Sequence, residues 1–301
     1  MAAHAPQFTG VFAAAVTPHR REGYEADFAA MLELVDFLGR NGVQGICLLG
    51  ATGEFINVKL AERIRLVHLA VKRSRVPIIA GVSHSTLDGA LELADEAMSS
   101  GAVGLLVMPP YFFHYAQDEV IEFCLQFAGS VPKSTPILLY NIPQFTTGFS
   151  IETARTLLGT GRFAGIKDSS GDWDYFQKLR TFRDECDFAL MVGNDSLFTR
   201  AKAEGADGVI SGVACAVPEL LVALNRAICE NATERVQALE RKLQEFISWI
   251  DRFPAPVGIK VATTARGIKV GPLAVPLAKE NAARLEEFKK WFPQWLPSVL
   301  K

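Results

Sequence analysis

The sequence has few cysteines, and none of them lies in a CxxC pair. The five are odd in number and widely spaced, so neither a disulfide framework nor a zinc knuckle is indicated. An excess of one charge is also missing, because 31 lysines and arginines nearly balance 33 aspartates and glutamates. Nucleic acids and anionic lipids bind to clustered basic residues, so we expect neither as a partner. The cysteines are Cys47, Cys124, Cys186, Cys215 and Cys229.

Membrane spans, targeting signals and several catalytic motifs are missing as well. No apolar segment reaches the length of a membrane span, and the opening MAAHAPQFTG does not join a basic stretch to an apolar run. We therefore expect a cytoplasmic protein without a membrane partner. The five histidines lack metal-ligand spacing, and no GxGxxG, GxSxG or P-loop motif occurs. These absences argue against a metal site, a dinucleotide cofactor, serine hydrolysis and nucleotide-triphosphate chemistry.

Eight short apolar runs recur along the first 211 residues. Each is too short for a typical helix, is rich in valine, isoleucine, leucine and alanine, and shows no polar alternation. This pattern is typical of strands that are buried on both faces of a parallel sheet. The runs span residues 10–16, 43–49, 76–81, 103–108, 136–140, 163–167, 188–192 and 207–211.

Helical periodicity fills the segments between these runs. In residues 26–40 the apolar side chains from Phe28 to Leu38 fall on one stripe, and Gly42 follows as a stop. Alternating strands and helices predict parallel pairing with right-handed crossovers, and eight such units favour a closed barrel over an open sheet. The other expected helices span 57–74, 86–100, 117–128, 151–158, 173–184, 195–204, 217–229, 232–250, part of 253–276, and 279–292.

The expected fold is therefore α/β, a (β/α)8 TIM barrel with a C-terminal helical extension. The alternation of strand and helix stops after the eighth unit, and only helical patterns follow. We assign residues 1–230 to the barrel, which forms the catalytic domain, and residues 231–301 to the extension.

One predicted strand end carries an unusual residue for its position. Lys167 closes the apolar segment FAGIK, where a charged ammonium is costly. Burial lowers the pKa of an amine, and the neutral amine is the form that attacks a ketone. Lys167 is thus a candidate for an imine with a small 2-oxo acid, which allows C–C bond cleavage without a metal or cofactor. From the residues alone, a lysine that reaches the rim or pairs with Asp168 is an equally open alternative.

Two other strand ends add groups that suit this chemistry. Tyr140 ends the preceding strand, and a phenol there can pass the proton that carbinolamine formation and aldol cleavage require. In the GATGE loop at residues 50–54, the backbone N–H groups and the Thr52 hydroxyl can cradle a carboxylate. Each feature alone also suits a structural role, as a core-edge tyrosine or an ordinary strand-to-helix turn.

Six short motifs, spread over nearly the whole chain, match a known family in order. They are VTP (16–18), GATGE (50–54), YNIP (140–143), GIKDSSG (165–171), GND (193–195) and GVIS (208–211). With these motifs and the helical tail, the chain resembles the dihydrodipicolinate synthase and N-acetylneuraminate lyase group of class I aldolases. The resemblance implies that Lys167 is the Schiff-base lysine and Tyr140 the proton-transferring phenol. It also implies that the Ala51 and Thr52 amides hold the carboxylate of the 2-oxo acid.

The resemblance extends to the pocket and to the assembly. It implies that backbone atoms near Gly193 and Ile210 line the pocket, and that Tyr111 and Phe112 occupy the positions of a tyrosine pair beside the substrate. It further implies a homotetramer or homodimer, a 2-oxo acid and an aldehyde as small-molecule partners, and no cofactor beyond the covalent imine.

Three positions depart from the pattern of the synthases. Ala51 replaces a hydroxyl residue, and Phe112 replaces the tyrosine that the synthases send into a neighbouring subunit's site. After YNIP the synthases place an arginine that binds the carboxylate of aspartate semialdehyde, whereas PQFTTG (143–148) has Phe145. Losing such a charge-assisted contact costs on the order of a hundredfold in affinity, so we do not expect a true dihydrodipicolinate synthase.

The sequence favours a lyase that cleaves a 2-keto-3-deoxy sugar acid reversibly to pyruvate and an aldehyde, through an imine on Lys167. Phe112, Phe113, Phe145 and Thr146 are expected to shape a less anionic end of the pocket. The alternatives are a dihydrodipicolinate synthase, a keto-deoxy acid dehydratase that uses the same imine, and a non-catalytic barrel that binds an oxo acid.

Overall fold

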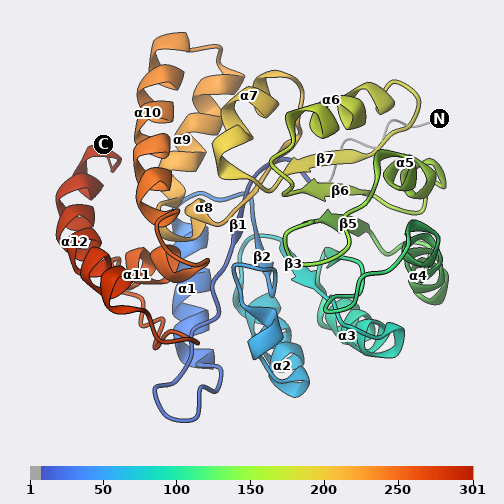
Figure 1. Ribbon diagram of the computed structural model, residues 1–301, viewed down its shortest axis with the longest axis horizontal. Helices are drawn as coiled ribbons and strands as arrows, with labels where there is room; N and C mark the ends of the chain where they lie inside the picture. The colour runs from blue at the N-terminus through green and yellow to red at the C-terminus, as the bar shows by residue number, and fades with distance from the viewer. Residues whose placement is uncertain (1–7, 301) are drawn as a thin grey trace.

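The computed structural model describes residues 8–300, in which eight parallel strands close into one barrel (Figure 1). Each strand pairs with the next along the chain, and β1 also pairs with β8. The expected TIM barrel with C-terminal helices is therefore confirmed. The strands are β1 (Gly10–Ala14), β2 (Gly45–Leu48), β3 (Ile78–Gly81), β4 (Gly104–Val107), β5 (Ile137–Asn141), β6 (Gly165–Asp168), β7 (Ala189–Val192) and β8 (Gly208–Ser211).

All residues of these strands are buried, which explains why their sequences are apolar without alternation. Closure of the barrel also needs a small residue at the seam between β1 and β8. A Cβ atom on Gly208 would lie only 2.1 Å from the carbonyl oxygen of Gly10, so a larger residue would push the two strands apart. The strand ends that carry the predicted catalytic residues are thus fixed in a closed ring.

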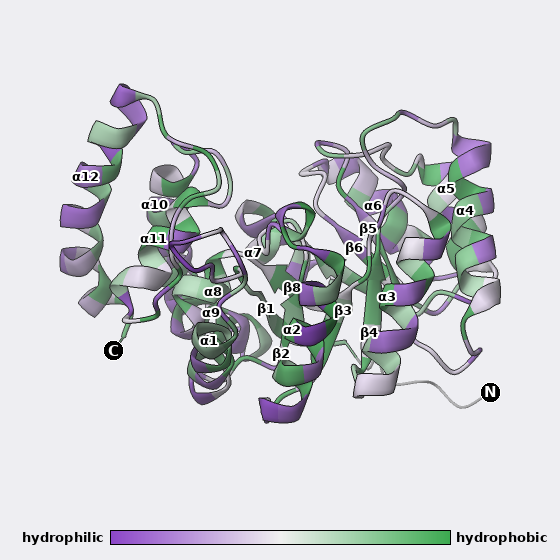
Figure 2. Ribbon diagram, turned by 90° about the horizontal axis from the view of Figure 1, so that it is seen from below, coloured by the Kyte–Doolittle hydropathy of each residue, from purple (hydrophilic) through white to green (hydrophobic). Residues whose placement is uncertain are grey.

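Helices follow the strands and cover the outside of the barrel, and their apolar faces point inward (Figure 2). Several begin at a side chain that accepts N–H groups of the first turn, such as Asp27, Ser150 and Asp172. The barrel helices are α1 (Phe28–Arg40), α2 (Leu60–Arg73), α3 (Leu87–Ser100), α4 (Gln117–Ser130), α5 (Ile151–Gly159), α6 (Trp173–Phe182), α7 (Phe198–Ala203), α8 (Val213–Ala216) and α9 (Pro218–Cys229), with short 3-10 turns η1 (Phe55–Asn57) and η2 (Asp195–Leu197).

The C-terminal extension consists of α10 (Thr233–Ile250), α11 (Val257–Ala265), α12 (Lys279–Trp295) and the short turn η3 (Leu296–Ser298). It packs beside α8 and α9, at the left of Figure 1. An aromatic cluster joins α10 to α12, with Phe246 stacked on Trp295 and Trp249 stacked on Trp291. The division at residue 230 stays a prediction. Within residues 8–300, no helix is long and apolar enough to cross a membrane.

Candidate active site

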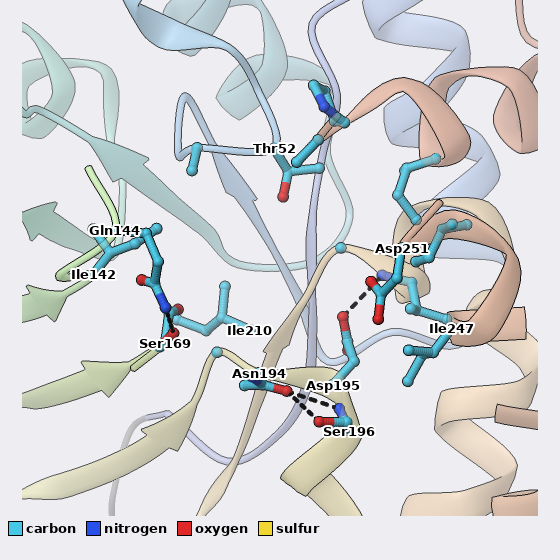
Figure 3. A pocket seen from close by; sticks show the side chains of 18 of the residues that line it. Thr52, Ile142, Gln144, Ser169, Asn194, Asp195, Ser196, Ile210, Ile247 and Asp251 are labelled. Carbon is cyan, nitrogen blue, oxygen red and sulfur yellow. Dashed lines mark hydrogen bonds between the residues drawn. The ribbon is translucent and has the colours of Figure 1, made fainter. Parts of the chain in front are cut away.

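A cavity of about 480 Å³ opens at the carboxyl ends of the strands. Strand-end residues form one side of it, and α10 with the chain that follows it forms the other (Figure 3). Six of the eight residues predicted to form the site line this cavity together. They are Ala51, Thr52, Tyr140, Lys167, Gly193 and Ile210.

Lys167 and Tyr140 are direct neighbours across the pair β5–β6. The Nζ atom of Lys167 lies 4.2 Å from the centre of the Tyr140 ring, and both residues are only 3% exposed. Within residues 8–300, no hydrogen bond or ion pair occupies this side-chain nitrogen. The lysine therefore does not reach the rim, and its nitrogen stays available on the cavity side.

Asp168 points away from the lysine, as alternation along a strand requires. Its carboxylate accepts hydrogen bonds from Asn141 Nδ2 at 2.8 Å and from the backbone and side chain of Ser170. Burial raises the pKa of Asp168, and these hydrogen bonds oppose that shift. The alternative in which Lys167 pairs with Asp168 is therefore not realised, because the carboxylate holds the strand ends β5 and β6 together.

The loop from Gly50 to Glu54 presents two free backbone donors to the cavity. Its turn is closed by hydrogen bonds from the N–H of Gly53 to the carbonyl of Gly50 and from Glu54 to Ala51, each 3.0 Å long. Within residues 8–300, the N–H groups of Ala51 and Thr52 have no hydrogen-bond partner. Consecutive free N–H groups can form a nest that attracts an anion, and the binding of a carboxylate by these two groups stays a prediction.

Gly193 occupies a position where no side chain fits. A Cβ atom there would lie 1.9 Å from Ser169 Oγ and 2.7 Å from Lys167 Cε. Lys167 and Ser169 are two residues apart on one strand end, so both project into the barrel. Within residues 8–300, the buried Ser169 hydroxyl has no hydrogen-bond partner. Gly193 thus keeps the space that the lysine and this hydroxyl need, and Ile210 lines the same cavity.

Tyr111 and Phe112 do not line the cavity that contains Lys167. They line an adjoining cavity of about 550 Å³, and Ala51 and Phe145 are among the residues that both cavities share. Tyr111 packs edge-on against Phe55, with ring centres 5.4 Å apart. Phe112 is 85% exposed and has a positive φ of 82°. Their expected role at the substrate stays a prediction.

Asp195 is a site residue to which the sequence reasoning assigned no role, although the GND motif contains it. Its carboxylate accepts hydrogen bonds from the hydroxyl of Ser211 and from the N–H of Val213. Burial raises its pKa to about 6, while these hydrogen bonds and the charge of Lys167 act in the opposite direction. A titratable acid therefore faces the cavity opposite the loop of Thr52 (Figure 3).

The sequence also does not predict that the C-terminal extension forms one wall of the cavity. Ile247 and Asp251 at the end of α10, and Gly258 and Ile259 in α11, line the cavity. Helical periodicity identifies these segments as helices, but it does not indicate which part of the barrel they cover. No local signal in the sequence reveals this long-range packing.

A closed (β/α)8 barrel with a buried lysine on the sixth strand and a tyrosine beside it on the fifth has the architecture of a class I, Schiff-base lyase. The chain belongs to the dihydrodipicolinate synthetase family, whose model matches residues 7–294. Enzymes of this family join pyruvate and an aldehyde through a lysine Schiff base and use no cofactor.

Curated relatives match most of the chain. A 4-hydroxy-tetrahydrodipicolinate synthase of Alkaliphilus oremlandii is 33% identical over 94% of this chain and 98% of its own. An uncharacterized DapA-like lyase of Halobacterium salinarum is 34% identical over 78% of this chain and 77% of its own. The crystal structure of dihydrodipicolinate synthase from Aquifex aeolicus is 27% identical, with a TM-score of 0.85 over 95% of this chain and 98% of that chain.

Proposed function

We propose that Lys167 forms an imine with pyruvate, and that the protein reversibly cleaves a 2-keto-3-deoxy sugar acid to pyruvate and an aldehyde. The observation that carries the imine is a buried lysine beside Tyr140 that forms no ion pair or hydrogen bond among the described residues. A lysine that no ion pair occupies is available as a nucleophile for Schiff-base formation.

The cleavage follows from the positions of these groups. The Lys167 amine attacks C2 of the oxo acid to give a carbinolamine, Tyr140 donates its phenol proton to the carbinolamine oxygen, and water leaves to give the iminium ion. The phenolate formed in this step takes the proton of the C4 hydroxyl, the C3–C4 bond breaks, and its electron pair moves into the enamine. Tyr140 then passes this proton to C3, and hydrolysis of the imine releases pyruvate and restores both the amine and the phenol. The aldehyde leaves after the bond has broken.

The free N–H groups of Ala51 and Thr52 would hold the carboxylate next to C2 throughout this sequence. A fixed carboxylate directs the ketone carbon toward the lysine and prevents the substrate from binding in reverse. This contact is made to backbone atoms, so it does not need the hydroxyl that Ala51 lacks.

The polar lining of the cavity supports a hydroxylated chain rather than a second carboxylate. Gln144, Ser169, Asn194, Asp195 and Ser196 all line the cavity (Figure 3). These groups accept and donate hydrogen bonds as hydroxyl groups require, and the carboxylate of Asp195 would repel an anionic end. The nearby Phe145 carries no charge with which to bind one.

Borohydride trapping tests the imine. Pyruvate with borohydride should inactivate the enzyme irreversibly and add the mass of the reduced adduct to the peptide that contains Lys167. Substituting Lys167→Met should abolish both effects, whereas Lys202→Met, which changes a lysine bonded to the carbonyls of Ala206 and Asp207, should not. Full activity after treatment of the parent would refute the imine.

A turnover screen tests the substrate. We expect pyruvate to be released from at least one 2-keto-3-deoxy sugar acid. Retention of every substrate carbon in the product would instead indicate a dehydratase. Imine trapping without turnover of any member of the panel would indicate a binding protein.

Synthesis of 4-hydroxy-tetrahydrodipicolinate is the second candidate, because the named function of the relative from Alkaliphilus oremlandii favours it. Phe145 in the place of the synthases' arginine weighs against it. Incubation with pyruvate and aspartate semialdehyde separates the two candidates, since only a synthase consumes both.

We also propose that the chain forms a homodimer or homotetramer. Phe112 and Phe113 are 85% and 65% exposed, and they meet edge-on beside the adjoining cavity. Exposed apolar residues that gather in one place are typical of protein interfaces. Light scattering should give a mass at least twice that of one chain, and Phe112→Ser/Phe113→Ser should lower it.

A further inference from the structure

A buried ion pair joins the C-terminal extension to the loop at residues 50–54. Nζ of Lys260 in α11 lies 2.7 Å from Oε2 of Glu54, and the two side chains are 2% and 10% exposed. The same Nζ donates to the carbonyl oxygen of Pro272 at 3.1 Å and lies 3.5 Å from the hydroxyl of Tyr24. Three segments that are distant in sequence therefore meet at one ammonium group.

Removing two charges from water is expensive, so such a pair is weak support for stability by itself. Its position suggests another role. Glu54 is the second residue after the nest, and its backbone is left-handed, with φ 50° and ψ 37°. Leu49, just before the loop, also has a positive φ of 57°. A non-glycine residue keeps such a backbone only where its surroundings hold it.

Other contacts fix the loop without reaching its two donors. The hydroxyl of Thr17 donates to the carbonyl of Gly53 at 2.6 Å. Tyr24 donates to Glu54 Oε1 at 3.4 Å, and it stacks on His19 with ring centres 3.9 Å apart. Lys260 differs from Thr17 and Tyr24 because it contacts the loop through a charged group. Its pairing with the Glu54 side chain fixes the end of the loop.

We propose that Lys260 is a positioning residue, which acts through Glu54 to hold the Ala51 and Thr52 amides toward the carboxylate of the bound 2-oxo acid. The inference rests on the proposed function, because it assigns that carboxylate to the nest. It makes the extension part of substrate recognition as well as part of the cavity wall. Lys260 itself touches no reacting atom.

The test compares two probes in borohydride trapping at Lys167. Pyruvate has the carboxylate that the nest would hold, whereas acetone is a ketone without it. Lys260→Met keeps the approximate length of the side chain and removes its charge. It should raise the half-saturating concentration of pyruvate about tenfold, the size of one lost charge-assisted hydrogen bond. The half-saturating concentration of acetone should stay within about twofold of that of the parent protein, because acetone has no carboxylate for the nest to bind.

Arg266→Met is the matched control. Arg266 ends the same helix and forms a comparable ion pair with Glu219, with side chains 10% and 21% exposed, but it bonds to α8 and α9 rather than to the loop. We expect this variant to lose stability without changing either half-saturating concentration by more than about twofold.

Glu54→Gln covers the case in which Lys260→Met does not fold, because it keeps the shape of the side chain and removes only its charge. It should reproduce the selective loss for pyruvate. Equal losses for pyruvate and acetone, or no loss in a folded variant, would overturn the role of Lys260. Failure of pyruvate to trap the parent protein would instead refute the imine on which the inference rests.

Discussion

Gly193→Ala is the sharpest test of the geometry around Lys167. The new methyl carbon would start 1.9 Å from Ser169 Oγ, 3.1 Å from Ser169 Cβ and 2.7 Å from Lys167 Cε. The hydroxyl can rotate away, but the lysine side chain must move by several tenths of an ångström. Displacements approaching 1 Å at a reacting atom cost about a hundredfold in rate, and overpacking costs about 1–3 kcal/mol of stability.

The assay is the rate of borohydride trapping at saturating pyruvate, measured together with the free energy of unfolding in urea. We expect the trapping rate of Gly193→Ala to fall by about one to two orders of magnitude. Adding Ser169→Ala should not restore it, because the contact with Lys167 remains. Gly39→Ala, where a Cβ meets nothing within 4 Å, is the control and should trap at the parent rate. Trapping by Gly193→Ala within about threefold of the parent would refute the steric reasoning.

Three further predictions concern the same cavity. Burial raises the pKa of Asp195 from 3.8 to about 6. The contribution of Asp195 to the free energy of unfolding is therefore fully present below pH 3.8 and is lost as the pH rises through 6. Urea unfolding between these pH values should show the parent losing about 1–3 kcal/mol relative to Asp195→Asn, and parallel curves would contradict the shift. Tyr140→Phe should lower kcat about 10²- to 10⁴-fold with an unchanged melting temperature, and a full kcat would exclude the phenol as proton carrier. Phe145→Arg should improve consumption of aspartate semialdehyde about tenfold or more, because a guanidinium can pair with its carboxylate, and no gain in a coupled assay would remove that explanation of specificity.

The fold was largely predictable because each strand is buried on both faces and therefore apolar throughout. The runs at 136–140 and 163–167 correspond to β5 and β6 with end shifts of one or two residues. The four-residue helix α8 was not predicted, since a fully buried turn has no polar face to create periodicity. In the region 253–276, α11 ends at Ala265, and an irregular segment follows.

The lining of the cavity was predictable where it consists of strand ends and the loops directly after them. The motif order identified Lys167, Tyr140 and the loop of Thr52, and all three line one cavity. Asp195 received no role, because its importance comes from burial against Ser211, which is 16 residues away. The cavity wall in α10 and α11 depends on tertiary packing, which local patterns do not encode.

The pairing of β1 with β8, together with the cavity wall from Ile247 to Ile259, has a consequence for biosynthesis. The barrel cannot close before residue 211 leaves the ribosome, and the cavity is not enclosed until about 50 residues later. At ~5–20 residues per second, Lys167 is made roughly 5 to 20 seconds before the last part of its cavity wall. During that interval the lysine belongs to a chain without an enclosed site, so a prematurely terminated product would carry the amine but not the enclosure around its substrate.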